Sequence, residues 1–410
     1  MSRNALASPA TPPERAESYF TSLQQALQKA GFFRPTLVID RSRLLANLDE
    51  VLGHLPESLQ YRTVTKSLPA VGLVDAVMRH SSSNRLMVFH QPFMTVAANR
   101  WPDCRMLLGK PMPAGALTAF YGSLSGERFD AGAQVEWLID SIHRLVQYER
   151  FARSKGVVLQ VNLEIDVGFH RGGFGSPEAV LPALQHIRSS PNLRISGFMG
   201  YDAHISMFPD HVGPPESALP ETTRRYRQFL AMAREVYRED FSPGKLTLNT
   251  GGSTTYRHYG SETVTPANEF ALGSGLLKPT FCDRALPMHI PAAFIATPVL
   301  KRLDGVSVPG LESDPTGGAR DAVRRDVTYF IYGGRWMADP VWPPKLSTHP
   351  VYGRSSNQDM FTSPSSTVLN VDDYVFFRPR QTEAVLLQFG DIAVFEEGRI
   401  VDTWQTFQSV

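Results

Sequence analysis

One lysine directly follows a short apolar run, where it is placed to act as a nucleophile. Lys66 comes after the β-type run 59–65, LQYRTVT, and Arg62 precedes it by four residues. A lysine amine desolvated at the end of a strand is suited to forming a Schiff base with a carbonyl. The alternative is an ordinary solvated lysine at a strand end. Other residues are needed to distinguish the two interpretations.

Charged side chains follow a second apolar run, VNLEI at 161–165. Asp166, His170 and Arg171 lie just past this run, and Glu164 lies within it. Charges so close to an apolar strand need partners, and a ligand with both acidic and anionic groups would provide them. Ion pairs within the cluster would satisfy the same need.

The run LRISGFMG, 193–200, is followed by Tyr201, Asp202 and His204. A tyrosine and a histidine at this position are able to hold a ring or to transfer a proton. A hydrogen-bonded core histidine is the alternative.

The segment NTGGST, 249–254, has the composition of an anion-binding loop. Glycine amides with the hydroxyls of Ser253 and Thr254 would point at a phosphate group, above all if a helix begins in TTYRHYG, 254–260, as we expect. The GSG sequence at 273–275 would add further N–H groups. The loop is neither a Walker loop nor a GxGxxG fingerprint, and glycine pairs also occur in ordinary turns.

Nine β-type runs alternate with amphipathic segments, which predicts repeated βα units. The runs are 36–40, 59–65, 85–90, 104–109, 135–140, 157–165, 193–200, 245–250 and 268–273. This number predicts an α/β fold with a TIM-type (β/α)₈ barrel, and an open doubly wound sheet is the alternative. Because a barrel has eight places, we expect 36–40 to lie outside it. The candidate residues all follow strands, where barrel enzymes have their active sites.

The chain on either side of the barrel has different patterns. Apolar residues at helical spacing between 14 and 30 predict a helix, preceded by a flexible lead-in at 1–13. Beyond 284 the helical pattern stops and successive β-type runs predict an all-β C-terminal domain. The segment 305–325 has the composition of an exposed loop. We therefore expect three parts, at 1–34, 35–284 and 285–410.

Composition excludes several classes of protein. The 410 residues are 42% hydrophobic and 20% charged, and the formal net charge is +1, so nucleic acid and membrane surfaces are not expected partners. Two cysteines cannot form a disulfide scaffold, and no zinc-binding spacing occurs. Neither a secretion signal nor an apolar run of eighteen residues is present. These features predict a cytoplasmic protein.

The order of the motifs resembles that of the fold-type III pyridoxal-phosphate enzymes, the alanine racemase group. The resemblance is closest to the branch of D-threonine aldolase and D-serine dehydratase and spans roughly residues 35–400. RTVTKS is similar to that branch's arginine-to-lysine segment, and IDVGFHRGG to its D-x-G-x-x-R-x-G element. GFMGYDAH is similar to its G-x-x-x-Y-x-G-H element. TGGST and NEFALGSG are similar to its phosphate loop and its E-x-x-x-G-S element.

The resemblance implies pyridoxal 5'-phosphate as the cofactor, bound as a Schiff base on Lys66, with His204 as a second catalytic residue. The implied cofactor-binding residues are Lys66, Arg171, Tyr201, Asn249, Gly251, Gly252, Ser253, Thr254, Gly273 and Ser274. It also implies a homodimer acting on a small amino acid.

The implied metal site departs from the branch. Members carry a histidine paired with cysteine or aspartate in the β-domain, where this chain reads RPRQTEAV with Gln381 and Glu383. A second histidine-containing segment is replaced by SSNQDMF at 355–361. Oxygen ligands of this kind suit Mg²⁺ or Mn²⁺ rather than Zn²⁺.

The resemblance leaves the reaction open among three possibilities. The leading interpretation is a lyase that cleaves a D-3-hydroxy amino acid or eliminates its hydroxyl group. The second is a metal-independent racemase or epimerase that uses Tyr332 or Tyr352 of the β-domain as a second base. The third is a non-catalytic pyridoxal-phosphate-binding protein.

Overall fold

The computed structural model describes residues 13–124, 128–207, 211, 213–261, 263–304, 326–349, 353–364 and 369–407. They form two compact units, one of residues 47–276 and the other of residues up to Ala46 together with those from Leu277 onward. The expected loop 305–325 and all but the last residue of the expected lead-in lie outside the described residues.

The unit 47–276 is the predicted barrel. Eight parallel strands pair in chain order, and the last strand returns to the first, so that Gln60 lies opposite Glu269. The strands are β2 (Gln60–Val64), β3 (Arg85–Val88), β4 (Arg105–Leu108), β5 (Val135–Ile139), β6 (Leu159–Glu164), β7 (Leu193–Gly200), β8 (Thr247–Thr250) and β9 (Glu269–Leu272). The TIM-type fold class is therefore confirmed.

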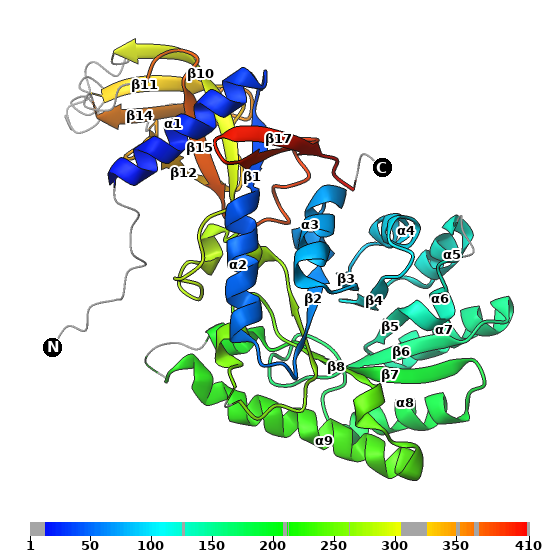
Figure 1. Ribbon diagram of the computed structural model, residues 1–410. Helices are drawn as coiled ribbons and strands as arrows, with labels where there is room; N and C mark the ends of the chain where they lie inside the picture. The colour runs from blue at the N-terminus through cyan, green and yellow to red at the C-terminus, as the bar shows by residue number, and fades with distance from the viewer. Residues whose placement is uncertain are drawn as a thin grey trace. The chain divides into compact units, whose positions relative to one another are not determined.

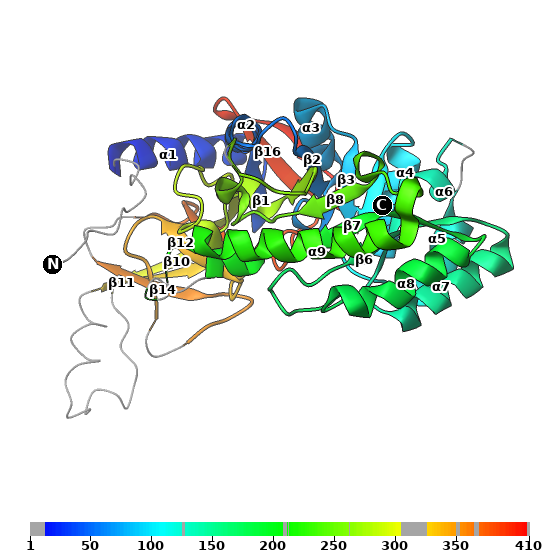
Figure 2. The same ribbon diagram turned by 90° about the horizontal axis from the view of Figure 1, so that it is seen from below.

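Helices follow most of the barrel strands. They are α3 (Val71–Ser81), α4 (Gln91–Arg100), α5 (Ala114–Ser123), α6 (Ala131–Gln134), α7 (Ile142–Lys155), α8 (Pro177–Ser189) and α9 (Leu219–Tyr237). Helix α8 packs beside both α7 and α9 (Figures 1 and 2). Along α9, Tyr226, Phe229 and Ala233 are buried at helical spacing, which fixes the face that it turns to the strands.

The prediction of a helix at 254–260 is wrong. The chain between β8 and β9 forms a single 3₁₀ turn at Tyr256–His258. Tyr256 and Tyr259, three residues apart, are both buried, and a spacing of three places two side chains on one side of a 3₁₀ turn. Burial of both rings therefore outweighs the helical pattern of the segment.

A charged network fills the barrel at the starting ends of its strands. The guanidinium of Arg62 is fully buried and donates to both carboxylate oxygens of Glu269, at 2.5 and 2.8 Å. Arg85 adds a second ion pair to Glu269 at 3.0 Å, and Glu136 lies 3.7 Å from Arg62. Two cations and two carboxylates thus neutralise one another where burial of any one alone would be costly.

The second unit is built on a β-sheet. Strand β1 (Thr36–Asp40) pairs antiparallel with β10 (Ala293–Asp304) and parallel with β16 (Ile392–Glu396), so the run 36–40 lies outside the barrel as expected. Because β1 belongs to this sheet, residues 35–46 lie with the β-domain rather than with the barrel as drawn from the sequence. Helix α2 (Arg41–His54) then leads from β1 to the barrel.

The remaining strands of this unit are β11 (Asp326–Ile331), β12 (Ala338–Trp342), β13 (Ser347–Thr348), β14 (Met360–Pro364), β15 (Tyr374–Pro379) and β17 (Arg399–Trp404). The expected helix is α1 (Pro13–Lys29), which ends before Gly31 in a left-handed conformation with φ of +80°. Phe20, Leu23 and Leu27 on this helix pack against the sheet (Figure 1).

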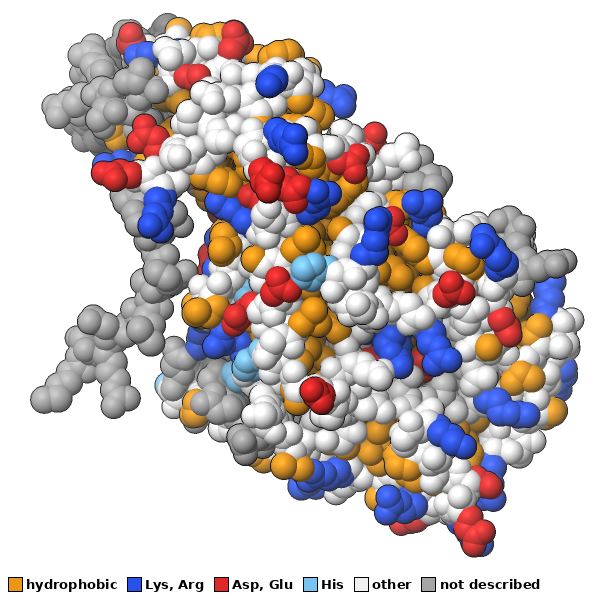
Figure 3. All heavy atoms as spheres, in the orientation of Figure 1, with side chains coloured by type: hydrophobic (Ala, Val, Ile, Leu, Met, Phe, Trp, Pro, Cys, Tyr) orange, Lys and Arg blue, Asp and Glu red, His pale blue; other side chains and the backbone are white. Residues whose placement is uncertain are grey.

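Acidic and basic side chains are interspersed on the face seen in Figure 3, as expected for a net charge of +1. Within the described residues, no helix combines the length and the apolar character needed to cross a bilayer.

Candidate active site

Lys66 lies where the sequence placed it, just past the end of β2. It is the central residue of a 3₁₀ turn, Thr65–Ser67, and its amine lies 4.6 Å from the centre of the Phe89 ring. Lys66 is partly exposed while Thr65 and Ser67 are buried. The turn therefore anchors its two ends and presents the lysine between them.

The glycine-serine segment after β9 lies against this turn. A Cβ atom at Gly273 would be 2.7 Å from the carbonyl oxygen of Val64 and 3.2 Å from Cβ of Ser67, so only glycine allows this approach. The next residue, Ser274, donates from its hydroxyl to Ser253 Oγ at 3.0 Å. The lysine turn, the GSG segment and the loop after β8 are thus in contact.

The loop 251–254 gathers several polar hydrogens at one place. Ser253 Oγ accepts from Ser274 Oγ and, at 2.9 Å, from the backbone N–H of Gly275. Gly251 has a φ of +94°, and a Cβ there would lie 2.2 Å from the Phe270 ring. An anion placed at these groups would accept the hydrogen bonds that they now share with one another.

Tyr201 connects the loop to the segment after β6. A Cβ at Gly252 would lie 3.1 Å from Tyr201 Cε2, so the tyrosine ring covers the loop backbone. The guanidinium of Arg171 stacks on the Tyr201 ring, 4.4 Å from the ring centre, and lies 5.3 Å from the centre of the Phe169 ring. Arg171, Tyr201 and loop 251–254 therefore form one continuous surface.

Asp166 orders the segment that delivers Arg171. Its carboxylate accepts from the backbone N–H groups of Gly168 and His170, at 2.9 and 3.0 Å, and contacts His170 Nδ1 at 2.6 Å. Although burial opposes the effect, these hydrogen bonds hold the pKa of Asp166 below its usual value. Asp166 thus stabilises the turn between β6 and Arg171.

His204 stacks on Phe169 with the ring planes 19° apart. Its Nε2 lies 3.0 Å from Thr222 Oγ1, and the Thr222 hydroxyl donates to the carbonyl of Ala218 at 3.0 Å. Nε2 must therefore carry the proton, which leaves Nδ1 as the acceptor. Nδ1 is buried with no hydrogen-bond partner among the described residues. Burial lowers the pKa of His204, against the opposing charge of Asp166.

The other predicted residues make contacts outside this group. Asn249 donates to Glu269 at 2.8 Å and so belongs to the buried network of the barrel. Thr254 bonds Ser206 Oγ at 2.8 Å, at the edge of the loop. Gln381 is exposed and Glu383 partly buried on the segment after β15, in the β-domain. Tyr352 lies outside the described residues.

The predicted metal ligands do not form a cluster of their own. Glu383 accepts from Thr382 Oγ1 at 3.1 Å, and no group of three or more His, Cys, Asp or Glu side chains suited to a metal occurs where the chain is described. An amide and one carboxylate match only a hard cation that keeps most of its water. The metal therefore stays a prediction.

The residues around Lys66 do fit pyridoxal 5'-phosphate. The amine of Lys66 lies beside two polar segments that each admit only glycine at one close approach, Gly251 in one and Gly273 in the other. The same group of residues includes His204, whose buried Nδ1 has no hydrogen-bond partner among the described residues. Sequence reasoning missed Phe169, Phe89 and Thr222, which position these groups. Phe169 stood inside a quoted motif, but nothing in the local pattern marks Thr222.

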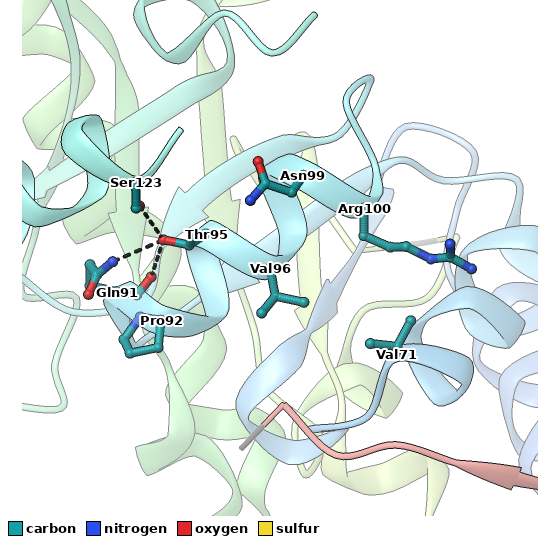
Figure 4. A pocket seen from close by; sticks show the side chains of 8 residues that line it. All are labelled: Val71, Gln91, Pro92, Thr95, Val96, Asn99, Arg100 and Ser123. Atoms are coloured by element: carbon teal, nitrogen blue, oxygen red, sulfur yellow. Dashed lines mark hydrogen bonds between the residues drawn. The ribbon is translucent and has the colours of Figure 1, made fainter. Parts of the chain in front are cut away.

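A separate hollow of about 530 Å³ lies along α4 in the helical layer (Figure 4). Its polar groups bond one another: Gln91 Nε2 donates to Thr95 Oγ1 at 2.9 Å, and Ser123 Oγ lies 2.7 Å from the same oxygen. The motifs found in the sequence do not reach it, and we assign it no function.

Comparison with known proteins agrees with the barrel fold described above. Residues 39–276 match the family described as alanine racemase, N-terminal domain, whose members depend on pyridoxal phosphate. No curated protein sequence matches.

Three solved structures illustrate the shared fold. D-threonine aldolase from Filomicrobium marinum has a TM-score of 0.69 at 14% identity, with 90% of this chain and 94% of that chain covered. D-threo-3-hydroxyaspartate dehydratase from Delftia sp. HT23 has a TM-score of 0.66 at 15% identity, covering 91% and 97%. Alanine racemase from Bacillus anthracis has a TM-score of 0.69 at 11% identity, covering 92% and 99%. With more than half of its length matched, the chain belongs to the alanine racemase N-terminal domain family of pyridoxal-phosphate enzymes.

Proposed function

We propose that the protein is a pyridoxal-phosphate-dependent lyase acting on a D-3-hydroxy amino acid, either by aldol cleavage or by elimination of the hydroxyl group. The observation that carries the proposal is the contact among three parts of the barrel rim: the Lys66 turn, the segment that begins at Gly273, and Ser253. The neutral His204 belongs to the same surface. The names of the aldolase and dehydratase neighbours support the substrate class.

The chain's own residues divide the work of holding the cofactor. Lys66 would bind it covalently through its amine, and Ser253, Ser274 and the N–H of Gly275 would donate to its phosphate group. Arg171 and Tyr201 would bound the side that faces Phe169. When bound, this cofactor accepts the electron pair released as a bond at the substrate's α-carbon breaks.

His204 is suited to accept a proton. A lowered pKa keeps its ring neutral near pH 7, and the bond from Nε2 to Thr222 leaves Nδ1 as the basic atom. Cleavage of a 3-hydroxy amino acid requires a base at the substrate hydroxyl. We assign this role to His204.

A racemase is the second candidate, and one observation favours it. Tyr332, just past β11 in the β-domain, is 44% exposed and is the candidate second base of this reaction. Racemisation needs a base on each face of the α-carbon, whereas cleavage of a 3-hydroxy amino acid does not.

The first experiment identifies the cofactor lysine. We expect protein incubated with pyridoxal phosphate to absorb near the visible edge, and borohydride to bleach the band and leave the cofactor on one lysine. Peptide mapping should find the adduct on Lys66, with Lys110, on the segment after β4, as an internal reference. An adduct on another lysine would refute the assignment.

The second experiment distinguishes the reactions. Purified protein is incubated with D- and L-3-hydroxy amino acids, and aldehyde, keto acid and enantiomer are measured separately. Aldehyde or keto acid from the D-substrates supports the lyase. Formation of the opposite enantiomer alone supports the racemase, and no product from a cofactor-loaded protein would indicate the non-catalytic alternative.

The third experiment tests the phosphate loop. Ser253→Ala removes one hydroxyl without removing core volume, so affinity for pyridoxal phosphate should fall about fivefold while the melting temperature is kept. An unchanged affinity would mean that NTGGST is only a turn.

A further inference from the structure

Asp202 follows Tyr201 at the end of β7, yet its side chain turns away from solvent and is fully buried. Its neighbours Tyr201 and His204 belong to the candidate active site, whereas Asp202 takes no part in the roles assigned above. A buried carboxylate is costly unless its oxygens are satisfied, so its contacts indicate what it does.

Within the described residues, the three side-chain hydrogen bonds of Asp202 all come from hydroxyl groups around loop 251–254. Thr250 Oγ1 lies 3.3 Å from Oδ2 and shares its one hydrogen between Oδ2 and the carbonyl oxygen of Gly200, at 3.2 Å. Thr255 Oγ1 donates to Oδ1 at 3.0 Å. The phenol of Tyr259 also donates to Oδ2. Thr250 is the residue before the loop and Thr255 the residue after it, so one carboxylate binds both ends.

This arrangement is not an ion pair. In the described part of the chain, the interactions of Asp202 involve the three hydroxyls and its own backbone, and burial raises its pKa against these hydrogen bonds to about 6. Core packing alone would be served better by an apolar side chain, because a carboxylate pays a desolvation penalty. Restraint of the loop explains why a carboxylate stands at this buried position despite the penalty.

The loop itself requires such restraint. Gly251 adopts a φ of +94°, which few residues tolerate, and Thr255 N–H donates to the carbonyl of Gly252 at 3.1 Å to close the turn. Glycine is the most flexible residue when unrestrained, and two adjoin here. A tether at each end compensates for that freedom.

We propose that Asp202 is a positioning residue that holds loop 251–254 in the conformation that binds the cofactor's phosphate group. This inference rests on the proposed function, because it takes the loop to be the phosphate site. Asp202 itself touches neither cofactor nor substrate in this role.

The affinity test compares pyridoxal phosphate with pyridoxal, which lacks the phosphate group. For Asp202→Asn and for Thr255→Val, affinity for pyridoxal phosphate should fall at least about fivefold, while affinity for pyridoxal is unchanged. Glu149→Gln is the control, because Glu149 is also a buried carboxylate bonded to a hydroxyl, Ser190 Oγ at 2.6 Å, but lies in the helical layer, where it also contacts His186 Nε2 at 2.9 Å. Equal losses for both ligands, or none, would overturn the proposal.

Hydrogen exchange of the cofactor-free protein tests the tether separately. The amides of Thr255, His258 and Tyr259 should exchange faster in either variant than in the wild type and in Glu149→Gln. Faster exchange in the variants would support the tether by itself. If the wild type also bound no pyridoxal phosphate, the proposed function and the phosphate role of the loop would be refuted while the tether would stand. Unchanged exchange in both variants would refute the tether itself. If Asp202→Asn does not fold, Thr255→Val gives the same two readouts.

Discussion

The imidazole of His204 is restricted to one tautomer by a threonine eighteen residues further along the chain. Thr222 is buried on α9, and its own hydroxyl hydrogen is already donated to Ala218. The single proton on the neutral ring is therefore held at Nε2. The tautomer of His204 therefore depends on the hydroxyl of a residue on a different element, α9.

Replacement of Thr222 tests this dependence. Thr222→Val should remove the preference for the Nε2–H tautomer and lower the unfolding free energy by about 1 kcal/mol. Thr222→Ser keeps the hydroxyl, so it should keep both the tautomer and the wild-type stability. Nitrogen chemical shifts of His204 measured by NMR report the tautomer directly. Identical spectra for the valine and serine variants would contradict the assignment.

The buried carboxylate of Asp202 predicts a particular pH dependence. Folding raises the pKa of Asp202 from 3.8 to about 6, so the folded protein binds this proton more tightly than the unfolded chain. The unfolding free energy contributed by this group is therefore greatest below the lower value and falls as pH rises through the window between the two. Urea unfolding should show this fall in the wild type but not in Asp202→Asn. A variant with the wild-type slope across that window would exclude Asp202 as its source.

At the scale of elements, barrel stability depends on the network around Arg62. Arg62→Met leaves the buried Glu269 and the partly buried Glu136 with less positive charge, and we expect a loss of about 3–5 kcal/mol of unfolding free energy. Arg79→Met is the matched control: Arg79 is exposed and pairs with Asp75 on the surface, so its loss should stay within about 1 kcal/mol. Similar losses in the two variants, measured by urea unfolding, would contradict this account.

Elements with alternating or continuous apolar patterns were predictable from the sequence. All eight barrel strands fall within the predicted runs, because buried parallel strands are apolar on both faces. The sequence does not predict strand β12, because it contains Pro340 and ends before two further prolines, which is tolerated where its one partner in the sheet is β15. Strands β13 and β14 were missed as well, since β13 is only two residues long and the segment before β14 is rich in polar residues.

Only part of the candidate site was predictable from the sequence. Lys66, Ser253 and Ser274 follow strands, and strand ends converge at one rim of a barrel, so their meeting could be expected. The contacts of Asp202 and Thr222 could not, because they depend on side-chain directions and on tertiary partners distant in the chain. Asn249 shows the same limit, since its place at the edge of a motif gave no sign that its side chain joins the barrel network.

At the scale of the whole molecule, the lyase proposal predicts dependence on a hard cation. Dialysis against a strong chelator should abolish activity, and Mg²⁺ or Mn²⁺ should restore it better than Zn²⁺, because Gln381 and Glu383 offer oxygen ligands. Glu383→Ala should raise the concentration of metal required, whereas Glu397→Ala, on the hairpin after β16, should not. Activity that ignores the chelator and both substitutions would favour the racemase.

The β-domain also exposes large apolar side chains, which fits the expected homodimer. Phe281 and Met337 are 51% and 49% exposed, and each is joined to Arg380 by a backbone hydrogen bond. Phe281→Glu should shift the molecular mass measured by light scattering toward the monomer. Val371→Glu, at a site 50% exposed on another loop, is the control. A mass unaffected by Phe281→Glu would place any dimer contact elsewhere.

The pairing of Arg62 with Glu269 has a consequence for how the barrel assembles. The two residues are 207 positions apart, on the first and last strands of the barrel. Without β9, Arg62 keeps only its 3.7 Å pair with Glu136, and Arg85 loses its partner Glu269. Ring closure and electrical neutrality are therefore reached in the same step. An open sheet built from the same eight strands would place Arg62 and Glu269 on opposite edges, so their ion pair stabilises only the closed form.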